Sequence, residues 1–199
     1  MIDSTVEYYN KNAEQFLAET MNVEFSETQK AFLKLLPASA VILDFGCGSG
    51  RDALEFLRQG YQVDATDGSA EMCHAASELT GLPVRQMLFQ DLDEIEKYNG
   101  IWACSSILHL PRTTLKDVLV KMCMALKDGG IAYSSFKYGT FEGKRNDRYF
   151  TDFTEESFED FISGINGLKI EKMWITADVR PGREQEKWLN IILRKQTIR

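Results

Sequence analysis

The densest group of residues that could do chemistry is Asp44-Phe45-Gly46-Cys47-Gly48-Ser49-Gly50, directly after the apolar run VILDF at residues 41–45. A turn without Cβ atoms lets a ligand approach the backbone, and a helix that begins near Arg51 would direct its N–H groups at an anionic part of that ligand. The dinucleotide fingerprint places its third glycine three residues after the second, whereas Gly48 and Gly50 are only two apart. The segment therefore predicts a cofactor-binding turn that departs from the dinucleotide pattern.

Acidic residues follow the next two apolar runs. Asp67 closes the run at residues 61–67, about 20 residues beyond the glycines, where Rossmann-like folds place an acid that accepts hydrogen bonds from ribose hydroxyls. Gly68 follows it, and Ser69 is a typical N-cap for a helix over 70–79. Asp91 follows the third run, so we expect these acids to meet at one edge of a sheet.

The pattern Asp-x-Gly-x-Gly-x-Gly after the first strand resembles the first motif of class I S-adenosylmethionine-dependent methyltransferases, and the resemblance extends over residues 40–137. The phrases LHLP, SFKYG, RYFTDF and KWLNIIL are similar to small bacterial methyltransferases of the general tellurite-resistance and uncharacterised type. The resemblance implies S-adenosylmethionine as the cofactor, with its methionine part on the glycine turn. It also implies that Asp91 accepts a hydrogen bond from the adenine amino group and that Leu92 donates its backbone N–H.

The residues expected to bind the cofactor come from the glycine turn, the ends of the next two strands and a fourth strand in GIWACSSI. They are Asp44, Gly46, Cys47, Gly48, Gly50, Arg51, Asp67, Gly68, Met72, Asp91, Leu92, Cys104 and Ser105. For Asp44 a purely structural role, capping neighbouring backbone N–H groups, is an equally good interpretation.

His109 and Tyr9 are the candidate catalytic residues. His109 follows the fourth strand and precedes Pro111, where a histidine that only satisfies a turn is the competing interpretation. Tyr9 lies in an aromatic group with Tyr8 and Phe16 that either covers the cofactor or packs within its own helices. Tyr138 is a further candidate if the acceptor needs a base.

The cysteines and histidines do not indicate a metal site. Cys47, Cys73, Cys104 and Cys123 occur singly, and His74 and His109 are not spaced from them as zinc ligands are. Cys47 and Cys104 are expected to be small packing residues.

Six cations fall in two segments that a Rossmann topology brings near the carboxyl ends of the strands: Lys137, Lys144, Arg145, Arg148, Arg180 and Arg183. Solvated surface charges are the simple interpretation. The functional interpretation is a rim that holds an anionic acceptor, because guanidinium groups bind carboxylates and oxyanions in a bidentate way.

Alternating short apolar runs and amphipathic segments predict an α/β, Rossmann-like three-layer sandwich with a mostly parallel seven-stranded sheet and a C-terminal antiparallel hairpin. At 199 residues a single domain is expected. Its parts would be an N-terminal helical lid (1–36) of two segments, with a Ser26/Gln29 capping box, then a cofactor-binding core (40–137). The remainder (138–199) would supply a loop at 138–150, an acidic helix and the hairpin on the substrate side.

The formal charge of −7 argues against nucleic acid or an anionic membrane as partner. Neither a signal segment nor about 18 consecutive apolar residues occur, which predicts a cytoplasmic protein. We expect a monomer or a homodimer.

The expected activity is methyl transfer to a small-molecule acceptor. The sulfonium is already an activated leaving group, so the protein has chiefly to align the acceptor and exclude water. An alcohol or protonated amine would benefit from a base, whereas a thiolate or oxyanion would need none. Two alternatives stay open: an oxidoreductase that binds a nicotinamide dinucleotide, and a non-enzymatic S-adenosylmethionine-binding protein.

Overall fold

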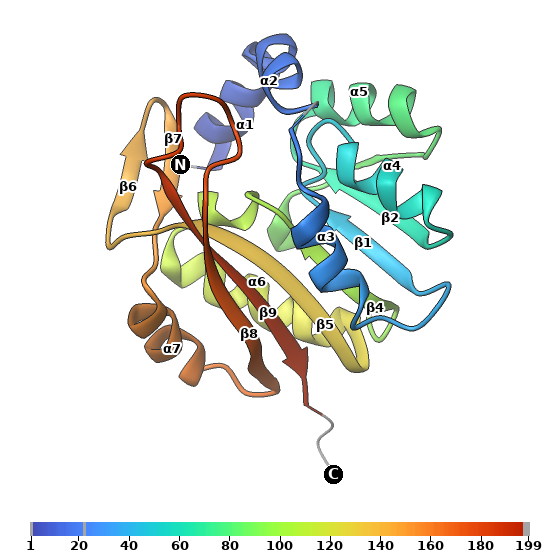
Figure 1. The fold of residues 1–199 in the computed structure, drawn as a ribbon, viewed down its shortest axis with the longest axis vertical. Helices are drawn as coiled ribbons and strands as arrows, with labels where there is room; N and C mark the ends of the chain where they lie inside the picture. The colour runs from blue at the N-terminus through green and yellow to red at the C-terminus, as the bar shows by residue number, and fades with distance from the viewer. Residues whose placement is uncertain (1, 22, 197–199) are drawn as a thin grey trace.

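A seven-stranded sheet forms the centre of the computed structural model, which describes residues 2–21 and 23–196 (Figure 1). The strand order is β3-β2-β1-β4-β5-β9-β8. These strands are β1 (Val41–Phe45), β2 (Gln62–Asp67), β3 (Arg85–Gln86), β4 (Tyr98–Ala103), β5 (Leu126–Lys137), β8 (Leu168–Ala177) and β9 (Lys187–Lys195). Two further strands, β6 (Glu142–Arg145) and β7 (Arg148–Thr151), form a separate antiparallel pair.

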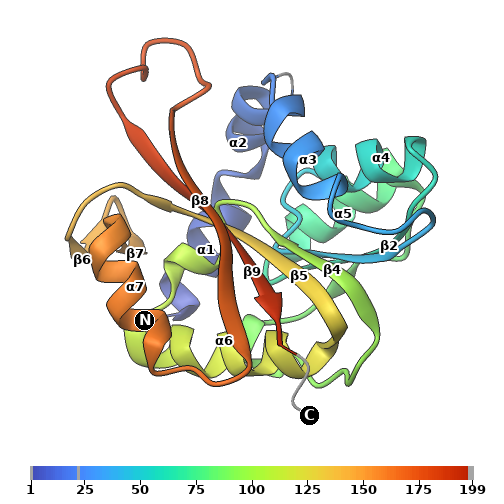
Figure 2. The ribbon, with the colours of Figure 1, turned by 60° about the horizontal axis from the view of Figure 1, so that its bottom comes forward.

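Helices cover both faces of the large sheet (Figure 2). They are α1 (Ile2–Lys11), α2 (Ala13–Thr20), α3 (Ser26–Leu33), α4 (Arg51–Arg58), α5 (Ala70–Thr80), α6 (Arg112–Ala125) and α7 (Glu155–Ser163), with the short 3-10 helices η1 (Phe89–Asp91) and η2 (Ile107–His109). Buried side chains of α3, α4 and α5 pack on one face, around Trp102. Those of α6 and α7 pack on the other face, around Phe136.

The order and direction of the strands confirm the expected fold class. From β3 to β5 neighbouring strands are parallel, and β9 and β8 add an antiparallel hairpin at the β5 edge. β1 is apolar along most of its length because helices cover both of its faces. The pairings Phe45↔Thr66 and Asp44↔Trp102 bring the carboxyl ends of β1, β2 and β4 to one edge, and this edge positions the site.

The N-terminal region differs from the expectation of two helical segments, because the chain breaks at Asn12 and forms three helices. The predicted Ser26/Gln29 capping box is wrong. Phe25 is the N-cap of α3 and makes no side-chain cap bond. The Gln29 side chain is instead buried and donates a 2.7 Å hydrogen bond to Asp52 Oδ1, a tertiary partner more than 20 residues away.

The third strand, expected in the apolar run before Asp91, is short and covers only Arg85–Gln86. It pairs only with β2, and because β2 ends at Asp67, opposite Gln86, the following residues have no strand to pair with. The chain turns instead into η1. The fifth strand, by contrast, is long, begins at Leu126 and takes in Gly129 at an irregularity in its pairing with β4.

The segment expected as a loop at 138–150 contains most of the β6–β7 hairpin. Its turn is formed by Asn146 and Asp147, both with positive φ (48° and 63°). Asn and Asp tolerate this conformation better than other residues with a Cβ, and two such residues fit the tight turn that joins antiparallel strands. Charged residues throughout β6 and at the start of β7 concealed these strands in the sequence.

Replacing the N-cap of α7 should destabilise the protein measurably. Thr154 Oγ1 accepts a hydrogen bond from Ser157 N, and Ser157 Oγ accepts one from Thr154 N, which completes a capping box. We expect Thr154→Ala to lower the free energy of unfolding by about 1 kcal/mol in urea denaturation. The exposed Thr113→Ala in α6 is the matched control and should change it by less than about 0.5 kcal/mol. Equal effects would contradict the capping role.

Candidate active site

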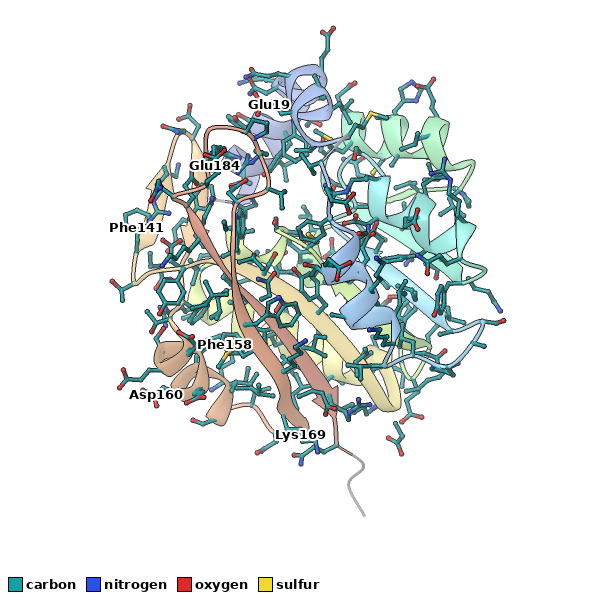
Figure 3. All side chains as sticks on the ribbon, viewed as in Figure 1. Glu19, Phe141, Phe158, Asp160, Lys169 and Glu184 are labelled. Carbon is teal, nitrogen blue, oxygen red and sulfur yellow. The ribbon has the colours of Figure 1, made fainter. Side chains whose placement is uncertain are left out.

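A cavity of about 220 Å³ opens at the carboxyl edge of the parallel strands. The glycine turn and the ends of β2 and β4 form its floor, and residues of α1, α2, β7 and the β8–β9 loop form its walls. Figure 3 shows the labelled Glu19 of α2 and Glu184 of the β8–β9 loop at the same end of the molecule. Segments from both ends of the sequence therefore meet over the glycine turn.

The glycine turn depends on its lack of side chains. Gly46, Gly48 and Gly50 have φ values of 82°, 53° and 79°, in the left-handed region that favours glycine. A Cβ at Gly46 would lie 2.5 Å from Ser106 Cβ, so the turn also packs directly against the segment after β4. The N–H groups of Gly46 and Cys47 both donate to Thr66 O at 2.9 Å, which fixes the turn to the end of β2.

Asp67 links the two turns that border the cavity. Its Oδ2 accepts from Gly48 N at 2.9 Å and its Oδ1 from Ser69 N at 2.8 Å. Ser69 in turn caps α5, as expected, because its Oγ accepts from Met72 N. Burial raises the pKa of Asp67, and the backbone N–H donors oppose this rise. A carboxylate oxygen accepts more than one hydrogen bond, so Asp67 keeps acceptor capacity for a ligand.

Asp44 carries an unsatisfied buried oxygen. The residue is 2% exposed, lines the cavity, and its Oδ2 has no hydrogen-bond partner among the described residues. Burial and the neighbouring Asp52 carboxylate hold the pKa of Asp44 well above its ordinary value. A buried acceptor of this kind suits a positively charged donor, such as the amino group of S-adenosylmethionine, and the site fits that cofactor here.

Asp52 was not predicted from the sequence, and it organises the part of the cavity wall next to Arg51. Its carboxylate accepts from Gln29 Nε2, from Trp102 Nε1 and, in a bidentate pair, from Arg51 Nε and Nη2, at 2.7–2.9 Å. Arg51 also donates to Thr20 O of α2. Asp52 thus ties α3, β4 and α2 to the start of α4, and no local pattern signals these distant donors.

Most of the other expected cofactor residues also line the cavity, namely Cys47, Gly68, Met72, Cys104 and Ser105. Ser105 has a positive φ of 52° and donates its N–H to Ser135 Oγ. Burial raises the pKa of Cys104 to about 12 and that of Cys47 further still. Both side chains are therefore neutral thiols at physiological pH rather than nucleophiles.

Asp91 and Leu92 do not line the cavity. Asp91 is exposed, Leu92 is buried in the core, and its N–H donates to Phe89 O at 3.4 Å. Because η1 follows β3 so soon, Phe89 and Gln90 line the cavity instead, and Gln90 Oε1 is buried without a partner among the described residues. The adenine contacts of Asp91 and Leu92 stay predictions, and Gln90 is an addition that the sequence did not single out.

The structure brings the two candidate catalytic residues together. Tyr9 Oη and His109 Nε2 lie 2.8 Å apart, and His109 Nδ1 lies 2.6 Å from Tyr149 O. A carbonyl oxygen only accepts, so Nδ1 carries the imidazole proton and Nε2 accepts from the Tyr9 hydroxyl. Burial lowers the pKa of His109 to about 4, an effect that Arg148 strengthens and the Tyr149 carbonyl opposes. His109 is therefore neutral at physiological pH.

Four of the six loop cations border the cavity, and acids neutralise three of them. Lys137 pairs with Asp178 and Glu186, Arg180 with Asp178, and Arg183 with Glu186. Among the side chains that the structure describes, Arg148 has no carboxylate partner. Lys144 and Arg145 do not line this cavity. Tyr138 does not line it either, and its hydroxyl donates to Glu155.

Two features are absent from the described part of the chain. No group of three or more His, Cys, Asp or Glu side chains there is placed to hold a metal ion. None of the helices there is long and apolar enough to span a membrane.

Comparisons with known proteins bear on the family and the fold. Residues 42–130 match the family model of a methyltransferase domain. A search of curated sequences found no match. Among solved structures, 1,6-didemethyltoxoflavin-N1-methyltransferase from Burkholderia thailandensis, bound to 1,6-didemethyltoxoflavin and S-adenosylhomocysteine, is similar with a TM-score of 0.75 and 22% identity, over 96% of this chain and 85% of that one.

Two further structures show how widely the fold is shared. A SAM-dependent methyltransferase from Methanosarcina mazei has a TM-score of 0.73 and 15% identity, over 84% of this chain and 98% of that one. A candidate Zn-dependent alcohol dehydrogenase from Rhodobacter sphaeroides has a TM-score of 0.77 and 11% identity, over 98% of each chain. At these identities the likeness shows the fold alone.

The matched methyltransferase domain at residues 42–130 and the strand order agree with the Rossmann-like fold of S-adenosylmethionine-dependent methyltransferases. The chain is accordingly a methyltransferase that uses S-adenosylmethionine, and its acceptor is not identified.

Adding a methyl group to the turn should remove cofactor binding. In Gly46→Ala the new Cβ would meet Ser106 at 2.5 Å, so the turn has to shift. We expect loss of S-adenosylhomocysteine binding in calorimetry. Gly60→Ala is the control, because Gly60 has a similar φ of 87° but nothing within 4 Å of its Cβ position. It should destabilise the protein by about 1–2 kcal/mol and leave binding unchanged. Unchanged binding in Gly46→Ala would contradict this role of the turn.

The low pKa of His109 predicts a specific dependence of stability on pH. The unfolded chain protonates this imidazole below pH 6.5, whereas the folded protein does so only near pH 4. Between these values the unfolded state binds more protons, so His109 lowers the free energy of unfolding as the pH falls, by at most about 1.4 kcal/mol per pH unit. This contribution is absent above pH 6.5 and constant below pH 4.

Comparison of urea denaturation for wild type and His109→Gln across pH 4–7.5 isolates that contribution. The variant should lose less stability than wild type between pH 6.5 and 4. Parallel curves would show that His109 titrates normally in the folded protein.

Proposed function

We propose that this protein transfers the methyl group of S-adenosylmethionine to a small, anionic molecule held between the glycine turn and the Tyr9–His109 pair. The observation that carries the proposal is that these two parts face one cavity. The glycine turn, fixed by Asp67, and the paired hydroxyl and imidazole both line it. Positioning of two reactants in this way can contribute roughly 7–11 kcal/mol to lowering a barrier.

The cofactor half uses residues with unused hydrogen-bonding capacity. Asp44 Oδ2 accepts from the amino group, Asp67 accepts from the ribose hydroxyls, and Gln90 provides a polar contact for the adenine beside the predicted Asp91 and Leu92. The backbone of the glycine turn lies against the methionine part. The remaining contacts are the predicted ones: Cys47, Gly68, Met72, Cys104 and Ser105 line the same half. The cofactor supplies an activated methyl group as a sulfonium.

The acceptor half is assembled from segments far apart in sequence. Tyr9 of the N-terminal part (1–36) closes the cavity over the core (40–137), and Arg148 of the C-terminal part (138–199) completes its wall. Tyr9 and His109 contact the acceptor and orient it. A neutral imidazole of low basicity suits hydrogen bonding better than proton removal at neutral pH.

The state of the cysteines bears on the cellular compartment of the protein. All four cysteines are free thiols, as expected in a reducing compartment, and we propose a cytoplasmic enzyme that acts as a monomer or homodimer, without nucleic-acid or membrane partners.

The decisive test of the cofactor assignment is Asp67→Ala. Because Asp67 holds Gly48 and faces the ribose position, we expect S-adenosylhomocysteine affinity to fall roughly 100-fold in calorimetry. Asp64→Ala is the matched control on the same strand, since Asp64 pairs with Lys97 and does not line the cavity. It should leave the affinity unchanged.

Three results would contradict the proposal. Equal affinity in Asp67→Ala and wild type would show that the cofactor lies elsewhere, and tight binding of a nicotinamide dinucleotide, followed by its fluorescence, would favour an oxidoreductase. Absence of single-turnover methyl transfer to every member of a panel of small acidic acceptors would favour a binding protein without turnover.

A further inference from the structure

Arg148, at the start of β7, is unusual among the cations of the cavity. Five cationic side chains line it, and carboxylates pair with the other four, Arg51, Lys137, Arg180 and Arg183. For Arg148 the described residues offer no carboxylate. Its Nη1 donates to Tyr9 Oη at a long 3.4 Å, and its Nε is buried without a partner among those residues.

Aromatic rings, rather than polar groups, surround this guanidinium. Its central carbon lies 4.4 Å from the centroid of Tyr8, 5.2 Å from Phe150 and 5.8 Å from Tyr9. His109 packs edge-on against Phe150 and is neutral. The ring faces stabilise the cation in part. A buried guanidinium donor without an acceptor still costs free energy, and an anionic ligand would remove that cost.

The cavity wall around Arg148 thus combines one unneutralised charge with flat apolar surfaces. Leu108 and Leu110 complete it beside Phe150. A ligand with several charges would leave some of them buried and unpaired here, whereas an aromatic body with a single ionised group would satisfy both features.

We propose that the methyl acceptor is a small aromatic acid that binds with its ring against the Phe150–Tyr9 wall and its ionised oxygen or nitrogen on Arg148, which makes Arg148 the specificity-determining residue. This inference rests on the methyl-transfer function proposed above and adds the chemical class of its substrate.

The chemistry of such an acceptor agrees with the rest of the site. It arrives without its proton, so a lone pair on its oxygen or nitrogen forms the new bond to the methyl carbon while the carbon–sulfur bond breaks and its electron pair stays on sulfur. No base is required, which accords with the weakly basic His109. The product has lost its negative charge, and with it the attraction to Arg148, so product release is favoured over substrate release.

The test uses 4-nitrophenol, whose ionised form is identified by its absorption spectrum, with the full-length protein saturated with S-adenosylhomocysteine. Binding to Arg148 should stabilise the phenolate and lower the apparent pKa of the bound probe. The neutral 4-nitroanisole should bind at least roughly tenfold more weakly. In Arg148→Gln the affinity for the phenolate should fall roughly 10- to 100-fold and the shift should vanish. Arg148→Lys, which keeps the positive charge, should retain part of the pKa shift of the bound probe.

Arg145→Gln is the matched control, because Arg145 lies on the same hairpin, pairs with Asp152 and does not line this cavity. It should leave both readouts unchanged. Equal binding of phenolate and anisole, no detectable phenolate binding, or an unchanged shift in Arg148→Gln would overturn the proposed substrate class. Failure of wild type to bind S-adenosylhomocysteine would instead overturn the cofactor site itself, and Arg148→Gln should leave that binding intact.

Discussion

The two hydrogen bonds that Asp67 accepts from Gly48 and Ser69 are the constraint on which the site depends. They join the turn after β1 to the turn after β2, so neither can move without the other. The three glycines adopt left-handed conformations without strain, and these bonds together with the contacts of Thr66 O hold the turn in place. A carboxylate that organises the protein backbone is also one whose position relative to a ligand is fixed before the ligand arrives.

The sequence was sufficient to predict the parts of the fold that rest on local signals. β1 is apolar because both of its faces are covered, Ser69 marks the start of α5, and the glycine spacing identifies the turn. Position along the chain then placed Asp44 and Asp67 at one sheet edge. Tyr9 and His109 were also predicted, although their direct contact, across 100 residues, was not.

The remaining features depend on tertiary contacts. Nothing near Asp52 in sequence indicates its bonds to Gln29 and Trp102. The spacing of Ser26 and Gln29 fits a capping box, but the Gln29 side chain bonds to this distant carboxylate instead. The early end of β3 follows from the length of its neighbour. Among the described side chains Arg148 has no carboxylate partner, while nearby cations have one, and this property of the assembled cavity cannot be read from any one segment.

The β6–β7 hairpin has a consequence for how enzymes of this architecture diversify. It forms its own two-stranded sheet, is anchored by a hydrogen bond from Thr151 Oγ1 to Leu110 O and by the buried Phe150, and brings Arg148 to the cavity and the Tyr149 carbonyl to His109. With the proposed acceptor, the strands that hold the cofactor and the hairpin that selects the acceptor are different parts of the chain. Insertions or exchanges in one short hairpin would retune which molecules are methylated while the nucleoside-binding machinery stays the same.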